Sequence, residues 1–457
     1  MTSRPTRPEN GTPITTIART PASRVARPTA SAVDVVVAAG LFVVTSALAW
    51  WRLAPAARNS LWAEDGRNFL ADSAGSRVGG AWFDPYAGYL HLLPRMSADL
   101  VTALAPLSRY AVAVTAVSCL VVAVVAVVVY VCAGDVIGDR TSRVVVALVP
   151  TLLPVTSWEV LGNLANLHWF LLWVTPWLLL RRYRTRTGLV LATIGAAVIA
   201  LTEIQAVLFV PLMLWHVRDA RRWPPRVALL IGLGAQVAAT VASPRAEVEG
   251  TAGSLSDLVT GYVVNVIGGV WWADAHQVGQ IAASHWPLLV AAALPFVAAT
   301  AYLLVRGDSR HRVATAALAL GSLGAYAGAY LANGYHRALY STYTPDAWLD
   351  GFQYTRYGVV PGMLLVALLP LALSLARSRS ARVPTLLITA GLLLVLVVQA
   401  AQLGSVQGAR AAGPVWPPQA TTVVDECDAG AAVGDASIAP GGPWLIVLPC
   451  SFVEDGE

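Results

Sequence analysis

Apolar runs of membrane length recur along almost the whole chain, and they restrict the possible folds more than any other feature. A helix of about 20 apolar residues crosses the hydrocarbon core of a bilayer. Inside lipid, every backbone polar group must be satisfied within helices or a closed barrel. We therefore predict an all-α, polytopic integral membrane bundle of about eleven transmembrane helices. The expected segments are 33–51, 111–132, 143–158, 164–180, 187–201, 203–216, 226–243, 286–305, 313–333, 357–376 and 383–401.

Composition supports a membrane protein and argues against a large soluble domain. Only 12% of the 457 residues are charged, whereas about a quarter would be expected in a soluble protein. The longest polar intervals are only about 40 to 60 residues, too short for a cytoplasmic domain that binds a nucleotide sugar. The sequence also lacks a Walker motif, so ATP is not the expected energy source.

The arginine residues indicate how the chain is oriented in the membrane. The formal net charge is +5, and all basic residues are arginines, which gather in short loops such as Arg181–Arg186 on alternate sides of the apolar segments. This is the positive-inside pattern, and it does not indicate nucleic-acid binding. We predict a multi-pass protein of the plasma (inner) membrane with a cytoplasmic N-terminus and an extracytoplasmic C-terminus.

Three regions follow from this topology. Residues 1–32 are rich in Thr, Pro, Ser and Arg and are predicted to form a disordered cytoplasmic tail. Residues 33–401 form the bundle, and its outer loops are 52–110, 244–285 and 334–356. Residues 402–457 are expected to be an extracytoplasmic tail with little hydrophobic content. A disulfide between Cys427 and Cys450 in an oxidising compartment would tie this tail together.

The first outer loop contains the sequence Trp62-Ala63-Glu64-Asp65-Gly66. A charged group beside a bilayer must be solvated, be paired with an opposite charge or serve a function. The two adjacent carboxylates are therefore a candidate functional site. They can act as a general base with an orienting partner, or share a divalent cation. In the alternative interpretation, Asp65 only caps a short helix at 66–74.

Further polar and aromatic residues are predicted on the same side of the membrane. Asn and His side chains suit sugar hydroxyls or phosphate oxygens, and an arginine can bind a phosphate through paired hydrogen bonds. Each also has a structural alternative, such as satisfying backbone groups at a helix turn or reaching lipid headgroups. The candidate substrate-binding residues are Tyr86, Tyr89, His91, Arg95, Glu159, Asn163, His168, Glu203, His336 and Arg356.

The arrangement resembles the GT-C superfamily of membrane glycosyltransferases, which use polyprenyl-phosphate sugars. The resemblance lies in the many apolar segments, in Trp62–Gly66, and more loosely in Tyr86–Arg95. It implies that an acidic residue of the first outer loop, Asp65 or Glu64, is the catalytic base. The donor would be a lipid-linked sugar, and the acceptor a glycan, lipid or protein on the extracytoplasmic face.

The expected reaction is an inverting transfer on the extracytoplasmic face, and the membrane lipids are further expected partners. Asp65 would take the proton of the acceptor hydroxyl, while Glu64 would orient it or help to hold a divalent cation. Arg95 and Arg356, together with His91 or His336, would stabilise the departing phosphate. Two alternatives stay open: a transporter or flippase of a lipid-linked solute, and a non-catalytic scaffold in the cell envelope.

Overall fold

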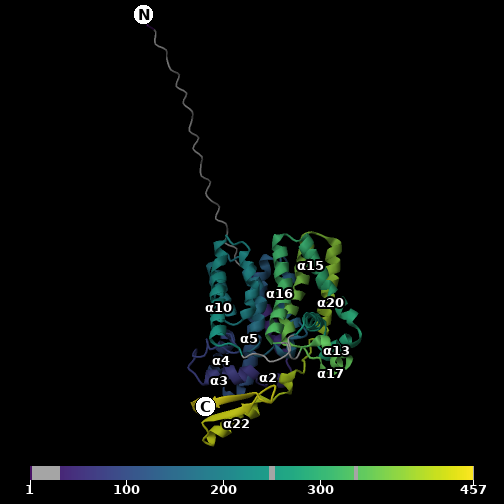
Figure 1. Cartoon of the computed structure of the whole chain (residues 1–457). Helices are drawn as coiled ribbons and strands as arrows, with labels where there is room; N and C mark the ends of the chain where they lie inside the picture. The colour runs from purple at the N-terminus through teal and green to yellow at the C-terminus, as the bar shows by residue number, and fades with distance from the viewer. Residues whose placement is uncertain (3–30, 246–252, 334–337, 456–457) are drawn as a thin grey trace.

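The computed structural model of the chain describes residues 1–2, 31–245, 253–333 and 338–455. Most of these residues are helical, and one two-stranded sheet lies near the C-terminus (Figure 1). The tail predicted to be disordered lies almost entirely outside the described residues, and so does the candidate His336.

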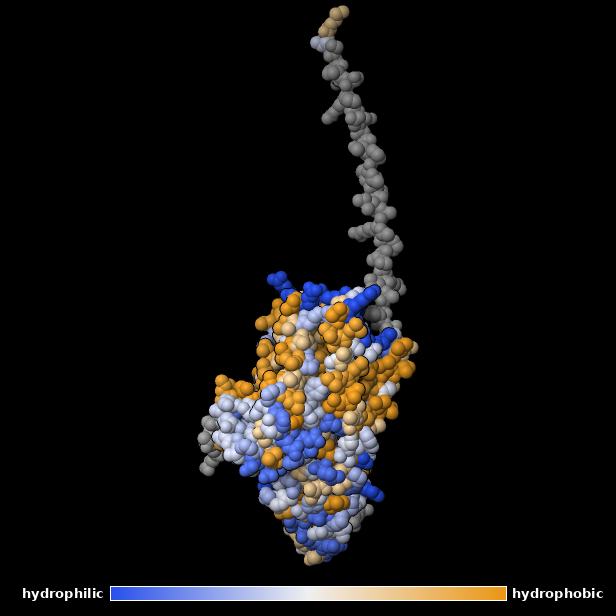
Figure 2. Space-filling model, turned by 90° about the vertical axis from the view of Figure 1, so that its right-hand side faces the viewer, coloured by the Kyte–Doolittle hydropathy of each residue, from blue (hydrophilic) through white to orange (hydrophobic). Residues whose placement is uncertain are grey.

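Within the described residues, seven helices are long and apolar enough to cross a membrane. On the face of the bundle seen in Figure 2, a hydrophobic band lies between hydrophilic residues above and below it. The chain is therefore built as a helical membrane protein. The spans are Ala32–Trp51 (α1), Leu107–Asp135 (with α5, Tyr110–Cys132), Ala220–Ala242 (with α10, Trp223–Ala242), Trp286–Arg306 (α14, Trp286–Ala292, and α15, Leu294–Arg306), Ser309–Asn333 (α16), Arg356–Ser378 (α18, Val359–Val366, and α19, Leu368–Ser378) and Arg382–Ala401 (α20).

The predicted count of about eleven membrane helices is not confirmed. The other four expected segments form helices of 13, 14, 15 and 11 residues: α6 (Arg140–Leu152), α8 (Leu167–Leu180), α9 (Arg186–Ala200) and the 3₁₀ helix η4 (Ile204–Leu214). Helix α6 stops at Leu152 because Leu153 precedes a proline and is extended. Helix α8 is buried along its whole length, as expected for a helix that is apolar on every face.

One end of the bundle carries the first loop, residues 52–106, and we call it the loop end. The loop contains α2 (Pro55–Arg58), the π-helical turn η1 (Asp65–Leu70), α3 (Ala71–Ala74) and α4 (Leu92–Leu104), and it lies beneath the long helices in Figure 1. The remaining elements between α10 and the C-terminal region are α11 (Leu255–Tyr262), η6 (Val263–Ile267), α12 (Gly268–Trp271), α13 (Ala275–Ser284), η7 (Tyr340–Thr342), α17 (Pro345–Gly351) and η8 (Arg356–Gly358).

The C-terminal region is a folded unit and not the tail that the sequence led us to expect. It comprises α21 (Ala409–Ala412), α22 (Trp416–Asp428), β1 (Val433–Ser437), β2 (Leu445–Pro449) and α23 (Cys450–Asp455). The two strands pair antiparallel, and each buries alternate residues. The sulfur atoms of Cys427 and Cys450 are bonded at 2.00 Å, so the expected disulfide is present and links α22 to α23.

This C-terminal unit docks directly on the first loop. The backbone N–H of Ala63 donates to the carbonyl of Ala439 at 2.6 Å, and the N–H of Ala439 donates to the carbonyl of Leu61 at 2.9 Å. Gly66 lies so close to Ile438 that an added Cβ would stand 2.7 Å from the Ile438 Cδ1 atom. The unit therefore fixes the backbone on both sides of Glu64 and Asp65.

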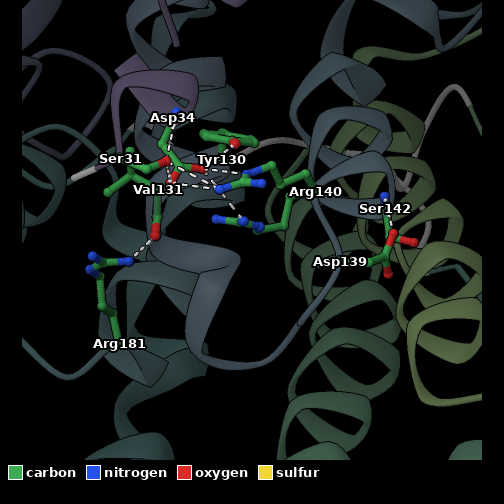
Figure 3. A network of polar contacts seen from close by, with 9 residues as sticks. Ser31, Asp34, Tyr130, Val131, Asp139, Arg140, Ser142 and Arg181 are labelled. Carbon is green, nitrogen blue, oxygen red and sulfur yellow. Dashed lines mark hydrogen bonds and ion pairs between the residues drawn. The ribbon is translucent and has the colours of Figure 1, made fainter. Parts of the chain in front are cut away.

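The opposite end of the bundle is rich in arginine, and we call it the arginine end. Asp34, near the start of α1, accepts hydrogen bonds from Tyr130 at 2.9 Å and from Arg140 at 3.0 Å (Figure 3). Nearby, Arg181 donates to the carbonyl of Val131. Six arginines at this end contact Asp34, Val131, Asp135 or Asp219. They are Arg140, Arg143, Arg181, Arg182, Arg222 and Arg310.

Candidate active site

A cavity of about 350 Å³ lies at the loop end, where the first loop meets α8, η4, α16 and η8. Its size suits a small polar group such as one sugar with its phosphate, and its wall combines charged and aromatic side chains. Six of the residues predicted from the sequence line it: Glu64, Tyr86, Tyr89, His168, Glu203 and Arg356. Residues from five separate stretches of the chain therefore converge on one space.

Glu64 is the carboxylate of the adjacent pair that faces this cavity. Its side chain is 13% exposed, and its Oε1 lies 3.8 Å from Nη1 of Arg356. Its other oxygen, Oε2, is buried and has no hydrogen-bond partner within the described part of the chain. Glu64 as a residue lines the cavity, and no described residue donates a hydrogen bond to its carboxylate, so the group can accept a proton from a bound molecule.

Arg356 is held in place by two carboxylates. Its Nη1 donates to Oε1 of Glu159 at 2.9 Å, and Glu64 is its second, more distant partner. Glu159 thus acts on the cavity through Arg356, although it does not line the cavity itself. The remaining guanidinium donors give this wall a fixed positive group that suits an anionic oxygen.

Asp65 lies behind the cavity wall and is completely buried. Its two oxygens accept hydrogen bonds from the backbone N–H groups of Leu164, at 3.0 Å, and Ala165, at 2.8 Å. Asp65 is not among the residues that line the cavity. Burial raises the pKa of Asp65 to about 7, against the opposing effects of Arg410 and these two N–H groups. Asp65 also does not cap the helix that it begins, because both its oxygens serve a different segment.

The turn that Asp65 holds, residues 160–166, positions one side of the cavity. Asn163 stays within this turn: its Nδ2 donates to the Glu159 carbonyl at 2.6 Å and its Oδ1 accepts the N–H of Asn166 at 2.9 Å. Gly162 has φ +81°, a conformation that favours glycine. Arg410 of the C-terminal unit donates to the Gly162 carbonyl. A carboxylate and a guanidinium therefore hold the same turn from two distant parts of the chain.

His168 and Glu203 form a hydrogen-bonded pair on the cavity wall. Nδ1 of His168 is hydrogen-bonded to Oε2 of Glu203, and Oε1 of Glu203 accepts the N–H of Gln205 at 2.6 Å. Both side chains are largely buried, at 10% and 2% exposure. The imidazole also packs on Trp169, with ring centroids 4.4 Å apart. The orientation of the imidazole is therefore fixed by Glu203 and by Trp169.

Tyr86 and Tyr89 reach the cavity from a tight turn. Their backbones exchange hydrogen bonds of 2.9 and 3.2 Å, and the two residues between them, Ala87 and Gly88, both have positive φ. His91 packs behind Tyr89 with ring centroids 4.0 Å apart. Burial, followed by the nearby His168, holds the pKa of His91 well below its usual range, so this imidazole is neutral and supports the tyrosines.

Arg95 lies outside the cavity. Its guanidinium is buried, pairs with Asp72 at 2.8 Å and sits over the ring of Phe69 at 5.6 Å, which fastens α4 to α3. Sequence reasoning also passed over Arg245, which lines the cavity at its exposed edge. Its signal was available, because arginines are scarce on that side of the chain. Arg410 offered no such signal, since its partners are distant in sequence.

The structure gives no metal site that the two acidic residues could form. The described residues contain no group of three or more His, Cys, Asp or Glu side chains that could hold a metal ion. Glu64 and Asp65 point to different environments, so they do not offer a shared set of oxygen ligands.

The chain matches no described protein family, no curated protein and no solved structure.

Proposed function

We propose that the protein is a membrane glycosyltransferase that moves a sugar from a polyprenyl-phosphate donor to an acceptor hydroxyl in this cavity. The observation that carries the proposal is the pairing of an uncommitted carboxylate with a fixed guanidinium: Glu64 and Arg356 lie 3.8 Å apart on one wall. Glycosyl transfer from a lipid phosphate needs a base for the acceptor and a cation for the leaving group. The resemblance to GT-C enzymes supports the same chemistry.

Glu64 is the proposed general base, in place of Asp65. As the acceptor oxygen attacks the anomeric carbon, its proton passes to the Glu64 carboxylate, which lines the cavity and receives no hydrogen bond from the described residues. Both Asp65 oxygens are occupied by backbone donors, so this residue positions the turn and does not touch the substrate. The transfer inverts the anomeric configuration because the acceptor enters opposite the phosphate.

Arg356 is the proposed phosphate ligand, and Arg245 is the second cation on the cavity wall. The departing phosphate accumulates negative charge in the transition state, so a guanidinium already in position lowers the barrier. Glu159 holds Arg356 from outside the cavity at 2.9 Å and prevents it from turning away. Tyr86, Tyr89 and the other aromatic residues of the wall give a sugar ring flat surfaces to pack on.

We place the loop end on the extracytoplasmic side of the plasma membrane and the N-terminus in the cytoplasm. Two observations support this orientation. The arginine end corresponds to the cytoplasmic side under the positive-inside rule. The Cys427–Cys450 disulfide belongs to the opposite end, where an oxidising compartment would maintain it. This side also gives access to glycan, lipid or protein acceptors of the cell envelope.

The direct test is sugar transfer by purified protein in liposomes. A panel of radiolabelled polyprenyl-phosphate sugars is supplied with a membrane extract as the source of acceptors. We expect transfer by the wild type and by the control Glu454→Gln, which changes an exposed glutamate of α23. Glu64→Gln removes the base and is expected to lower the rate by about 10²- to 10⁴-fold. Movement of intact donor across the bilayer without any transfer would instead favour a transporter.

A further inference from the structure

Counted over the residues that the structure describes, the cavity holds more negative than positive groups before any substrate enters. Three described carboxylates line it or pair with its wall, Glu64, Glu159 and Glu203, and two described guanidiniums do so, Arg245 and Arg356. A phosphodiester donor brings a further negative charge, and cleavage to a phosphate monoester adds another. Like charges this close together are unfavourable in a partly buried site, so a proton must be taken up nearby.

His168 is the one imidazole on the wall of this cavity among the residues that the structure describes. Its Nδ1 is committed to Glu203, and no described residue hydrogen-bonds to its Nε2. A carboxylate on Nδ1 fixes the orientation of the ring and leaves Nε2 as the nitrogen available to a bound molecule. The charged and titratable groups that face or adjoin His168 are Glu203, Glu64, Tyr89, His91, Arg245 and Arg356.

We propose that His168, oriented by Glu203, is the general acid of this site and protonates the departing lipid phosphate. The inference rests on the proposed lipid-phosphate donor and adds the group that handles its leaving oxygen. Glu203 is a positioning residue: its second oxygen is held by the Gln205 N–H at 2.6 Å, so the carboxylate cannot rotate away from the imidazole.

The step balances as follows. The bond between the anomeric carbon and the phosphate oxygen breaks, and its electron pair leaves with the oxygen. The acceptor oxygen forms the new bond to the anomeric carbon, and the acceptor proton passes to Glu64. Nε2 of His168 gives its proton to the lipid phosphate monoester. Solvent then carries the proton from Glu64 back to His168, which restores both groups for the next cycle.

The first experiment measures phosphate binding at His168 without any turnover. The protein is labelled with ¹³C at histidine Cε1 and held in detergent micelles, and the His168 signal is the one missing from His168→Gln. Decyl phosphate is the probe and decanol its uncharged control. We expect decyl phosphate to shift the His168 signal and raise its apparent pKa by about one unit or more, and decanol to do neither. In Glu203→Gln the apparent pKa is expected to fall by a similar amount. If decyl phosphate changes neither the chemical shift of the His168 signal nor its apparent pKa, the proposal is wrong.

The second experiment uses the pH dependence of transfer. His168→Gln is expected to lower the rate by about 10²-fold or more and to remove the alkaline limb of the pH–rate profile. Glu203→Gln keeps that limb but moves it to lower pH. His285→Gln, at an exposed histidine after α13, is the matched control and keeps the wild-type profile.

The outcomes separate the two proposals. If His168→Gln keeps the wild-type pH–rate profile, His168 is not the general acid, and the proposal of sugar transfer is unaffected. A His168 signal that responds to decyl phosphate in a protein that transfers no sugar would keep the lipid-phosphate site at His168 and remove its catalytic step together with glycosyl transfer.

Discussion

Glu64 and Asp65 are neighbours in the chain, yet their carboxylates lie on opposite sides of the cavity wall. Glu64 faces the cavity and Arg356, whereas Asp65 is completely buried and binds the backbone of Leu164 and Ala165. Successive residues of a helix point about 100° apart, and this geometry sends the two side chains to different environments. The pair therefore divides into one residue that lines the cavity and one that holds the turn at 164–165.

This division predicts opposite phenotypes for two amide substitutions. Glu64→Gln is expected to lower transfer by about 10²- to 10⁴-fold while the melting temperature changes by no more than about 2 °C. Asp65→Asn turns an acceptor into a donor that faces a backbone N–H, which costs roughly 1–3 kcal/mol of stability. Thermal melts and transfer rates measured on both variants check the prediction. If Asp65→Asn is as stable as the wild type but transfers no sugar, Asp65 and not Glu64 is the residue that acts on the substrate.

The pKa of Asp65 predicts how its contribution to stability depends on pH. Its folded pKa of about 7 lies above the unfolded value near 3.9, so the folded state holds the proton more tightly. This contribution is complete below about pH 4 and is lost as the pH rises to about 7. Asp65→Asn lacks the titration, so its deficit in melting temperature should shrink between pH 4.5 and 7.5. A deficit that stays constant over this range would show that Asp65 does not titrate there.

Arg356→Lys tests the phosphate ligand. Lysine keeps the positive charge but loses the planar fork that reaches Glu159 and an anion at the same time. We expect the KM for the lipid-phosphate donor to rise about tenfold, which corresponds to roughly 1.4 kcal/mol. Initial rates over a range of donor concentrations give this value. Arg109→Lys, at an exposed arginine just before α5, is the matched control and should keep the wild-type KM.

The close contact between Gly66 and Ile438 predicts a compensating pair of substitutions. Gly66→Ala places a methyl group 2.7 Å from Ile438 Cδ1, so the Ile438 side chain must leave its present packing, and stability falls by about 1 kcal/mol. Adding Ile438→Ala removes the clashing atom. The double variant is therefore expected to be more stable than the sum of the single effects predicts. Additive losses in a double-mutant cycle would mean that these residues do not share the contact.

The disulfide predicts a local effect on the C-terminal unit. Cys427 and Cys450 are 23 positions apart, and opening a loop of this size releases unfolded-state entropy worth about 3 kcal/mol. Cys427→Ser with Cys450→Ser should make α22 and the two strands sensitive to limited proteolysis, while the bundle stays intact. Transfer should also fall, because the unit pairs with Leu61 and Ala63 beside Glu64. If the rate of proteolysis does not change, the disulfide does not contribute to the stability of the C-terminal unit.

Local patterns in the sequence were enough to predict the long helices but not the short ones. A run such as Arg382–Ala401 is apolar over a full membrane thickness, and this property can be read directly from the residues. The segment predicted at 143–158 ends early because of the backbone restriction before Pro154. The strands Val433–Ser437 and Leu445–Pro449 are only five residues each, and such short patterns are weak evidence beside the apolar runs.

The candidate site was predictable in its residue types but not in its contacts. Glu64, His168 and Arg356 were identified because ionisable groups are rare beside apolar segments. That Asp65 faces the turn at 164–165, and that Arg410 reaches the Gly162 carbonyl, depends on contacts between residues about 100 and 250 positions apart in the chain. No periodicity within a single segment contains that information.

The pairing of Leu61 and Ala63 with Ala439 also has a consequence for biogenesis. The ribosome makes the Glu64 loop directly after α1, and it makes the backbone partner Ala439 only after α20. The candidate site therefore stays incomplete until all seven described spans have been synthesised. A nascent chain that has reached α20 but not Ala439 would have these helices made and its site still open.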